Sequence, residues 1–228
     1  MRLALVETGI GDGFRTHARS PVRRRRTRSI TAALACALLA ACSPFTRESP
    51  VRQTFLLAAP SAAAVAKPQP GTLRVGSINV AAPFRGKTFV YRVSDLRYEN
   101  DFYVEFLVTP GTMLAEQTAR ALEQSKPFAR IAGPGTSADA SWVLEGFASA
   151  IYADRREAGK PAAVLDITYY LTRAAVDEQV PLWTHDYHER VPMRDASATA
   201  YAEALNAAFG AVVTALSLDL SGVQLPQP

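Results

Sequence analysis

Cysteine is scarce in this chain. Cys36 and Cys42 are the only two cysteines in 228 residues, and both lie close to the N-terminus. The residues that follow Cys42 contain no thiol for a disulfide, so they must fold on a hydrophobic core alone. A chain of about 185 residues can bury such a core as one domain.

Histidine is also rare, which leaves little material for a metal centre. The only close pair of titratable ligands is His185 and His188, with Asp186 and Glu189 beside them. Residues three apart on a strand point to opposite faces, so these two imidazoles should diverge. Zinc needs three or four converging ligands, and we expect no metal site here.

Sequence patterns typical of catalysis or phosphate binding are absent. Ser137, Ser141 and Ser149 have no Gly-x-Ser-x-Gly setting for a hydrolase nucleophile. The turn at 133–135 lacks the lysine and the following helix of a phosphate loop. The charged stretch 154–157 is predicted to be a hairpin tip, and its spacing does not indicate an acid–base pair in a shared cleft. We therefore expect neither enzyme activity nor a cofactor.

Long apolar runs are missing as well. The apolar segment Ile30 to Ala41 has roughly 12 residues, against the ~20 that a membrane span needs. It follows the basic cluster 23–28 and ends in small residues, and these are the parts of a secretory signal. No other run is predicted to be long enough to span.

The signal ends in Leu39-Ala40-Ala41-Cys42, which matches the bacterial lipobox. In a lipobox the cysteine thiol is acylated, with palmitate among the chains, and the precursor is cut just before the cysteine. We expect Cys42 to be the lipid attachment site, the mature N-terminus and the sole membrane attachment. Two or more acyl chains anchor a protein stably, whereas one binds only marginally.

The positive charge of the chain lies mostly in this leader. Eight of the 25 basic residues precede Cys42, as do two of the 21 acidic residues, so the remainder has a net charge of −2. The basic pI near 9.2 belongs to the precursor and does not indicate a nucleic-acid partner. Residues 1–20 contain two acidic residues and three glycines, and we interpret them as an over-extended start of a signal region that covers 1–41.

The rest of the chain divides into a tether, a domain and a tail. Residues 42–70 are predicted to be a lipidated tether with one short strand at Thr54–Leu57, followed by an alanine- and proline-rich spacer. The domain is expected at 71–222 and a short tail at 223–228. Its strands are expected at 73–80, 88–93, 142–151, 162–172 and 182–191, whereas 98–107 could be helix or strand.

Two helices complete the domain. The first is predicted to begin at Thr109-Pro110 and to end before Pro127, and the second to run from a cap at Asp195 or Ser197 to about Leu220. The apolar stripe of the second helix should pack on the alternating face of strand 162–172. Its residues are Tyr201, Leu205, Phe209, Val212 and Leu216, facing Leu165, Ile167 and Tyr169. This order predicts an α+β fold, an antiparallel sheet with both helices packed on one face and the other face largely wet.

Several of these local patterns occur together in one known family. They are the lipobox at Cys42, the strand Thr54–Leu57, Leu73–Gly76 with Pro83, Phe89–Arg92, the aromatic run Tyr98–Phe106 with Pro110, Trp142–Gly146 and the closing helix. In these features the chain resembles the ABC-type transport auxiliary lipoprotein family, which includes the lipoprotein of the paraquat-inducible operon. Tyr91-Arg92 is the sharpest local match, and Asp101–Glu105 departs from the tryptophan-containing segment of many members.

The resemblance, which covers roughly Thr54 to Leu220, implies a function in the cell envelope. It implies a lipoprotein that works with a mammalian-cell-entry type ABC transporter, which moves lipids or hydrophobic solutes. The residue after Cys42 is Ser43 and not the aspartate that typically retains lipoproteins in the inner membrane. We therefore expect the protein to lie on the periplasmic face of the outer membrane.

Candidate partner contacts are Trp183, Tyr187 and Tyr98, which we expect to be exposed. Tyrosine and tryptophan are common interface anchors, although for each residue taken alone ordinary core or surface packing is the more common explanation. The partner would be a mammalian-cell-entry protein, with a homo-oligomer as a further alternative. Two other classes of function stay open: a structural or assembly lipoprotein of another envelope machine, and an enzyme whose site uses residues set aside above.

Overall fold

A long central strand, β6, organises the sheet of this protein. The computed structural model describes residues 51–58, 63–136, 139–174 and 180–227. In chain order the strands and the short 3-10 helix η1 are β1 (Gln53–Phe55), β2 (Gln69–Val80), η1 (Ala82–Phe84), β3 (Thr88–Arg92), β4 (Tyr98–Phe106), β5 (Phe128–Ala132), β6 (Trp142–Asp154), β7 (Ala162–Arg173) and β8 (Trp183–Pro192). Within these described residues the α-helices are α2 (Pro110–Ser125) and α3 (Ala198–Gly222).

The sheet is mixed, which corrects the prediction of an antiparallel sheet. Along one edge β6 pairs parallel with β2 and then with β3, and along its other edge it pairs antiparallel with β7, which in turn pairs antiparallel with β8. The β3–β4 pair is antiparallel, whereas β1–β4 and β2–β5 are parallel. Parallel pairing needs a crossover connection, and α2 lies on the chain between β2 and both of its parallel partners.

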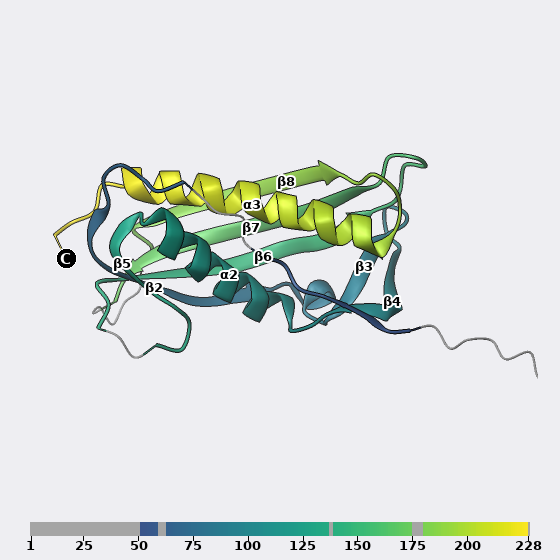
Figure 1. Cartoon of the computed structure of the whole chain (residues 1–228), viewed down its shortest axis with the longest axis horizontal. Coiled ribbons are helices and arrows are strands. Elements are labelled where there is room, and N and C mark those ends of the chain that lie inside the picture. The colour runs from purple at the N-terminus through teal and green to yellow at the C-terminus, as the bar shows by residue number, and fades with distance from the viewer. Residues whose placement is uncertain (1–50, 59–62, 137–138, 175–179, 228) are drawn as a thin grey trace, which may run out of the picture. The chain divides into compact units, whose positions relative to one another are not determined.

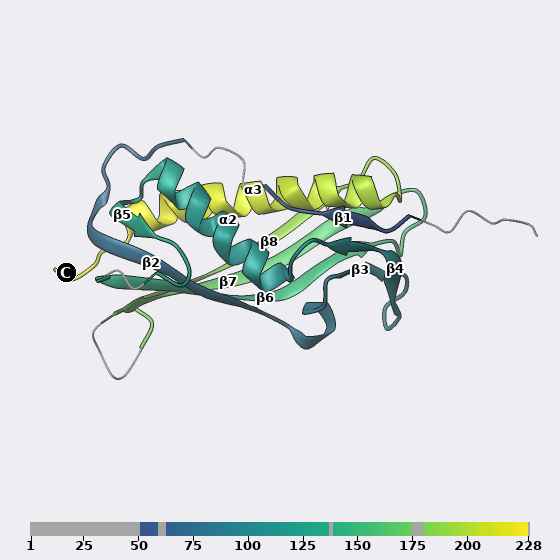
Figure 2. The same ribbon diagram turned by 60° about the horizontal axis from the view of Figure 1, so that its bottom comes forward.

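The predicted α+β class, with both helices on one face of the sheet, is confirmed. Figures 1 and 2 show α2 and α3 on the same side, with α3 lying along β7 and β8. Ser197 caps α3 by accepting a hydrogen bond from the Ala200 amide at 3.1 Å, and Asp195 in turn accepts one from the Ser197 amide. Of the two predicted caps, Ser197 is therefore the one that is used.

The predicted core register is also confirmed. All five stripe residues of α3 are fully buried, and so are Leu165, Ile167 and Tyr169 on β7. The Tyr169 hydroxyl lies 2.9 Å from the Thr118 hydroxyl, which links β7 to α2. The ring of Tyr201 packs edge-on against Phe89 of β3. One apolar layer thus holds both helices to the sheet.

Helix α3 has nearly the predicted bounds, and its composition is apolar enough to compare with a membrane span. It has 25 residues, and its most apolar 18-residue stretch is apolar enough to span a membrane by length and composition alone. The prediction that no other run is long enough is therefore wrong on that criterion. In the structure α3 lies on the sheet with its stripe buried, so it serves as a core helix.

The first strands fix where the domain begins. The short predicted strand is present as β1, which pairs with the end of β4, and the undecided segment 98–107 forms β4. Strand β2 begins at Gln69, two residues before the predicted domain boundary. The Gln69 side chain donates hydrogen bonds to the carbonyls of Ser221 and Val223, so the start of β2 is tied to the end of α3.

Candidate functional site

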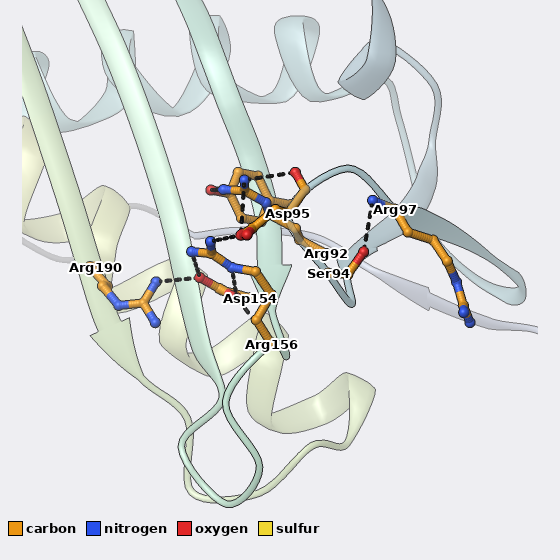
Figure 3. Close-up of polar contacts among 8 residues, drawn as sticks. Arg92, Ser94, Asp95, Arg97, Asp154, Arg156 and Arg190 are labelled. Atoms are coloured by element: carbon orange, nitrogen blue, oxygen red, sulfur yellow. Dashed lines mark hydrogen bonds and ion pairs between the residues drawn. The ribbon is translucent and has the colours of Figure 1, made fainter.

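A buried aspartate lies at the end of β6, on the sheet face opposite the helices. Asp154 is 2% exposed, and it accepts hydrogen bonds from Arg156 at 2.8 and 3.0 Å and from Arg190 of β8 at 2.8 Å (Figure 3). The hydrogen bond from the Arg156 side chain is the main cause that holds the pKa of this carboxyl well below its ordinary value, against the opposing effect of burial. Asp154, at the end of β6, therefore pairs with both Arg156 in the following loop and Arg190 on β8.

The same network continues into the turn between β3 and β4. Arg156 donates a second hydrogen bond, at 2.7 Å, to the carboxylate of Asp95, and Arg92 donates to the Asp95 backbone carbonyl at 2.9 Å. Figure 3 shows these side chains converging from β3, β6 and β8. The network carries three guanidinium groups against two carboxylates, so its net charge is positive.

Aromatic rings flank Arg92 in this network. Its guanidinium lies 5.6 Å from the ring centre of Tyr98 and 6.0 Å from that of Tyr152, distances at which a cation is attracted to the ring face. Phe84 of η1 stacks on Tyr152 and thereby covers part of this face. The face predicted to be largely wet is thus partly buried at this end.

The Tyr91-Arg92 pair divides between the two faces of β3. Arg92 joins the network described above, whereas Tyr91 is buried with the core and its hydroxyl donates to Asp101 at 2.9 Å. Burial is the largest cause that raises the pKa of Tyr91. The guanidinium of Arg155 lies 3.4 Å from the Tyr91 ring centre. On one face of the β3–β4 hairpin Tyr91 therefore links β3 to β4 through Asp101, and on the other face Arg92 links β3 to the turn at Asp95.

The three predicted partner contacts do not form one surface. Tyr187 is only 6% exposed, because the odd positions of β8 face α3, and its hydroxyl donates to Asp219 at 2.7 Å. The expectation that Tyr187 is exposed is therefore wrong. Trp183 is partly buried against the core and stacks on His185, whereas Tyr98 is 42% exposed at the other end of the sheet. Only Tyr98 has the exposure that was expected.

The two histidines diverge as their spacing predicts. His185 lies between the rings of Trp183 and Tyr187 on the helix side of β8, whereas His188 contacts Asp166 at 3.1 Å on the opposite side. Over residues 51–58, 63–136, 139–174 and 180–227, no group of three or more potential metal ligands comes together. Cys42 lies outside the described residues, so its acylation stays a prediction.

A pocket of about 410 Å³ lies where β2 passes the start of α2. Strand β2 has an irregularity between Val75 and Ile78, and a Cβ atom on Gly111 would lie 2.4 Å from the Ile78 carbonyl oxygen. Arg74, Glu116 and Glu145 line the pocket together with small and apolar residues. This lining offers charge of both signs, and within it the Ser77 hydroxyl donates a hydrogen bond to the Glu145 carboxylate at 3.5 Å.

An exposed apolar strand was missed by the sequence reasoning. Phe102 is 84% exposed, and Tyr103 and Leu107 are about half exposed, all on or directly after β4. The β3–β4 pairing shifts register between Thr88 and Val90, and β1 covers only the last three residues of β4. The density of aromatics in 98–107 was the available signal, but their alternation is broken by the register shift.

Comparisons with known proteins indicate the fold. Neither protein-family models nor curated proteins match this chain. Among solved structures, protein XCC0632 from Xanthomonas campestris, of family DUF330, is similar with a TM-score of 0.65 and 18% identity, over 75% of this chain and 96% of that one. An uncharacterized protein is similar with a TM-score of 0.59 and 13% identity, over 75% and 99%. At these identities the similarity establishes a shared fold.

A third structure is the PelC dodecamer from Paraburkholderia phytofirmans. It has a TM-score of 0.37 and 15% identity, over 68% of this chain and 93% of that one.

Proposed function

We propose that this chain is an outer-membrane lipoprotein, anchored through Cys42, that serves as the auxiliary component of a mammalian-cell-entry type ABC transport system. In this role it would hold a periplasmic transporter component while lipids or hydrophobic solutes cross the envelope. The single observation that carries the proposal is the lipobox ending in Cys42, followed by a domain with the DUF330 fold.

The arrangement of polar groups supports binding rather than catalysis. The strongest perturbation of a carboxylate in the described residues is at Asp154, where the pKa is lowered, so this group is fixed in its ionised form by two arginines. A general acid or base needs a pKa near the working pH. The cluster fits a scaffold that stiffens the β3–β4 end, with Tyr98 lying beside its member Arg92.

We place the partner contact at Tyr98 rather than at β8. Tyr98 is exposed, packs edge-on against Phe84 and Tyr152, and is thus held rigidly at low entropy cost, as interface anchors usually are. The burial of Tyr187 removes the predicted Trp183–Tyr187 pair as an anchor.

The anchor itself is tested by Cys42→Ala. The variant should give an uncut or soluble periplasmic protein, whereas wild type should float with outer-membrane fractions and yield an acylated N-terminal peptide. A processed, membrane-bound Cys42→Ala protein would contradict the lipoprotein assignment.

The transport role is tested by affinity capture from gently cross-linked, solubilised envelopes of the native host. Wild type should recover a mammalian-cell-entry protein, and Tyr98→Ala should recover several-fold less. Leu218→Ala, an exposed apolar position on α3, is the matched control and should behave as wild type. Recovery of a β-barrel or secretion pore in place of that protein would favour the alternative, a structural or assembly lipoprotein of another envelope machine.

A further inference from the structure

An exposed apolar surface follows the β1–β4 pair at one end of the sheet. Its members are all at least half exposed, and we call them the β1–β4 edge patch: Val51, Leu56, Phe102, Tyr103 and Leu107. Gln53 pairs with Val104, so Val51 and Phe102 each lie two residues before that pair and continue its face, whereas Leu56, Tyr103 and Leu107 occupy the alternate positions; the patch therefore lines both faces of this edge. The Leu107 amide bonds to the Phe55 carbonyl at 2.8 Å, which brings Leu56 and Leu107 alongside.

The charges around this patch nearly balance. Arg52 pairs with Glu105 at 3.6 Å, Lys87 donates to the Leu107 carbonyl at 3.0 Å, and Asp101 accepts a hydrogen bond from the Tyr103 amide at 2.9 Å, so two cations face two carboxylates. Soluble domains seldom keep large apolar side chains together on the surface without a binding role. Aromatic side chains with polar edges, such as Tyr103, are enriched where proteins meet the headgroup layer of a membrane.

The short length of chain between Cys42 and Val51 indicates which kind of surface covers the patch. Eight residues separate Cys42 from Val51, so a fully extended chain holds the two within about 30 Å of each other. The 25-residue helix α3 is ~38 Å long. The connection is therefore shorter than the domain, and it joins the domain at the β1–β4 end, whereas the end of α3 and the start of β2 lie at the opposite end (Figures 1 and 2).

We infer that the β1–β4 edge patch is a lipid-contacting surface, which rests on the phospholipid layer into which acylated Cys42 is inserted. The inference rests on the proposed lipoprotein anchor. Contact would be shallow and apolar, because the flanking charges cancel, and it should depend little on salt. It would orient the domain with the β1–β4 end against the membrane and the far end of α3 directed into the periplasm.

Site-specific fluorescence tests this orientation. Cys36 is removed with the signal and Cys42 is blocked by acylation, so an introduced cysteine is the only free thiol of the mature protein. Phe102→Cys and Leu107→Cys probe the patch, and Leu218→Cys, 62% exposed on α3, is the control. Each acylated protein is labelled with an environment-sensitive dye and reconstituted in vesicles of phosphatidylethanolamine and phosphatidylglycerol that carry a quencher near the headgroups.

The expected result is quenching at positions 102 and 107 that is at least about twofold stronger than at 218, unchanged between low and high salt. Equal quenching at all three positions, in protein whose acylation is verified by intact mass, would overturn the lipid contact alone. Absence of acylation would overturn the anchor and this inference together. A dye shift at position 102 that appears in detergent and grows with protein concentration would identify a second copy of the chain as the occupant, and would also overturn it.

Discussion

The shared carboxylate of Asp154 allows the sharpest prediction about stability. We consider Asp154→Asn, which keeps the size of the side chain but removes its charge. In the wild type one Asp154 carboxylate oxygen lies 2.8 Å from a guanidinium nitrogen of Arg156 and 2.8 Å from one of Arg190. The variant leaves both guanidinium groups without this negative charge. Removing one partner of a fully buried ion pair costs about 3–5 kcal/mol. The side chains of Arg156 and Arg190 are 37% and 51% exposed, so water can replace part of the lost interaction. We expect a loss of about 2–3 kcal/mol in the free energy of unfolding.

The matched control is Asp95→Asn in the same network. Asp95 also accepts a 2.7 Å hydrogen bond from Arg156, but its side chain is 82% exposed. Exposed ion pairs contribute ~0–1 kcal/mol, so this variant should lose less than about 1 kcal/mol. Denaturant unfolding of both variants at pH 7 measures the difference. A loss at Asp154 no larger than the loss at Asp95 would refute the burial argument.

The pH dependence supplies a second readout of the same group. The pKa of Asp154 is lowered in the folded state, mainly by the hydrogen bond from Arg156. Its contribution is therefore fully present above the unfolded-state pKa of about 4, and it is lost as pH falls toward the folded-state value. The stability gap between wild type and Asp154→Asn should stay constant from about pH 5 to 8 and shrink below about pH 4. A gap that widens on acidification would contradict this assignment.

Four further substitutions test the packing and the backbone by the same unfolding assay. Phe209→Ala removes a fully buried ring from α3 and should cost ~3–5 kcal/mol, and a loss below ~1 kcal/mol would show that the helix register is wrong. Gly111→Ala places a methyl group 2.4 Å from the Ile78 carbonyl oxygen and should cost about 1–3 kcal/mol, whereas Gly159→Ala, whose Cβ would meet no atom within 4 Å, tests the separate cost of a positive φ. Tyr187→Phe removes the hydrogen bond to Asp219 and should cost about 1 kcal/mol, and no loss would indicate that this residue is not tied to α3.

Periodicity predicted the elements whose faces differ clearly in polarity. The stripe of α3 and the alternation of β7 were predicted correctly because both elements bury one continuous apolar face. The inward face of strand β8 was harder to predict. Polar residues occupy odd and even positions alike around Trp183 and Tyr187, so nothing in the sequence indicates which face packs on α3. The exposure of Tyr187 was therefore predicted wrongly.

The pairing of the strands and the arginine network depend on distant contacts. An extra residue in β6 between Ala148 and Ala150 reverses the alternation, so Ile151 and Ala153 point to the core while Asp154 points to the other face. The sequence predicts that Asp154 lies in a hairpin tip, where a carboxylate would be exposed. Its partner Arg190 is 36 residues away on β8, and no local pattern connects the two.

The central claim is our proposal that this domain holds a component of a mammalian-cell-entry transporter. The most direct measurement is photo-cross-linking in intact cells of the native host, with a photoreactive amino acid at position 98 and, as the control, at position 218. The account predicts a cross-linked product at position 98 that mass spectrometry identifies as a mammalian-cell-entry protein, with no such product at position 218. A cross-link from position 98 only to a β-barrel or secretion component, or the same products from both positions, would contradict it.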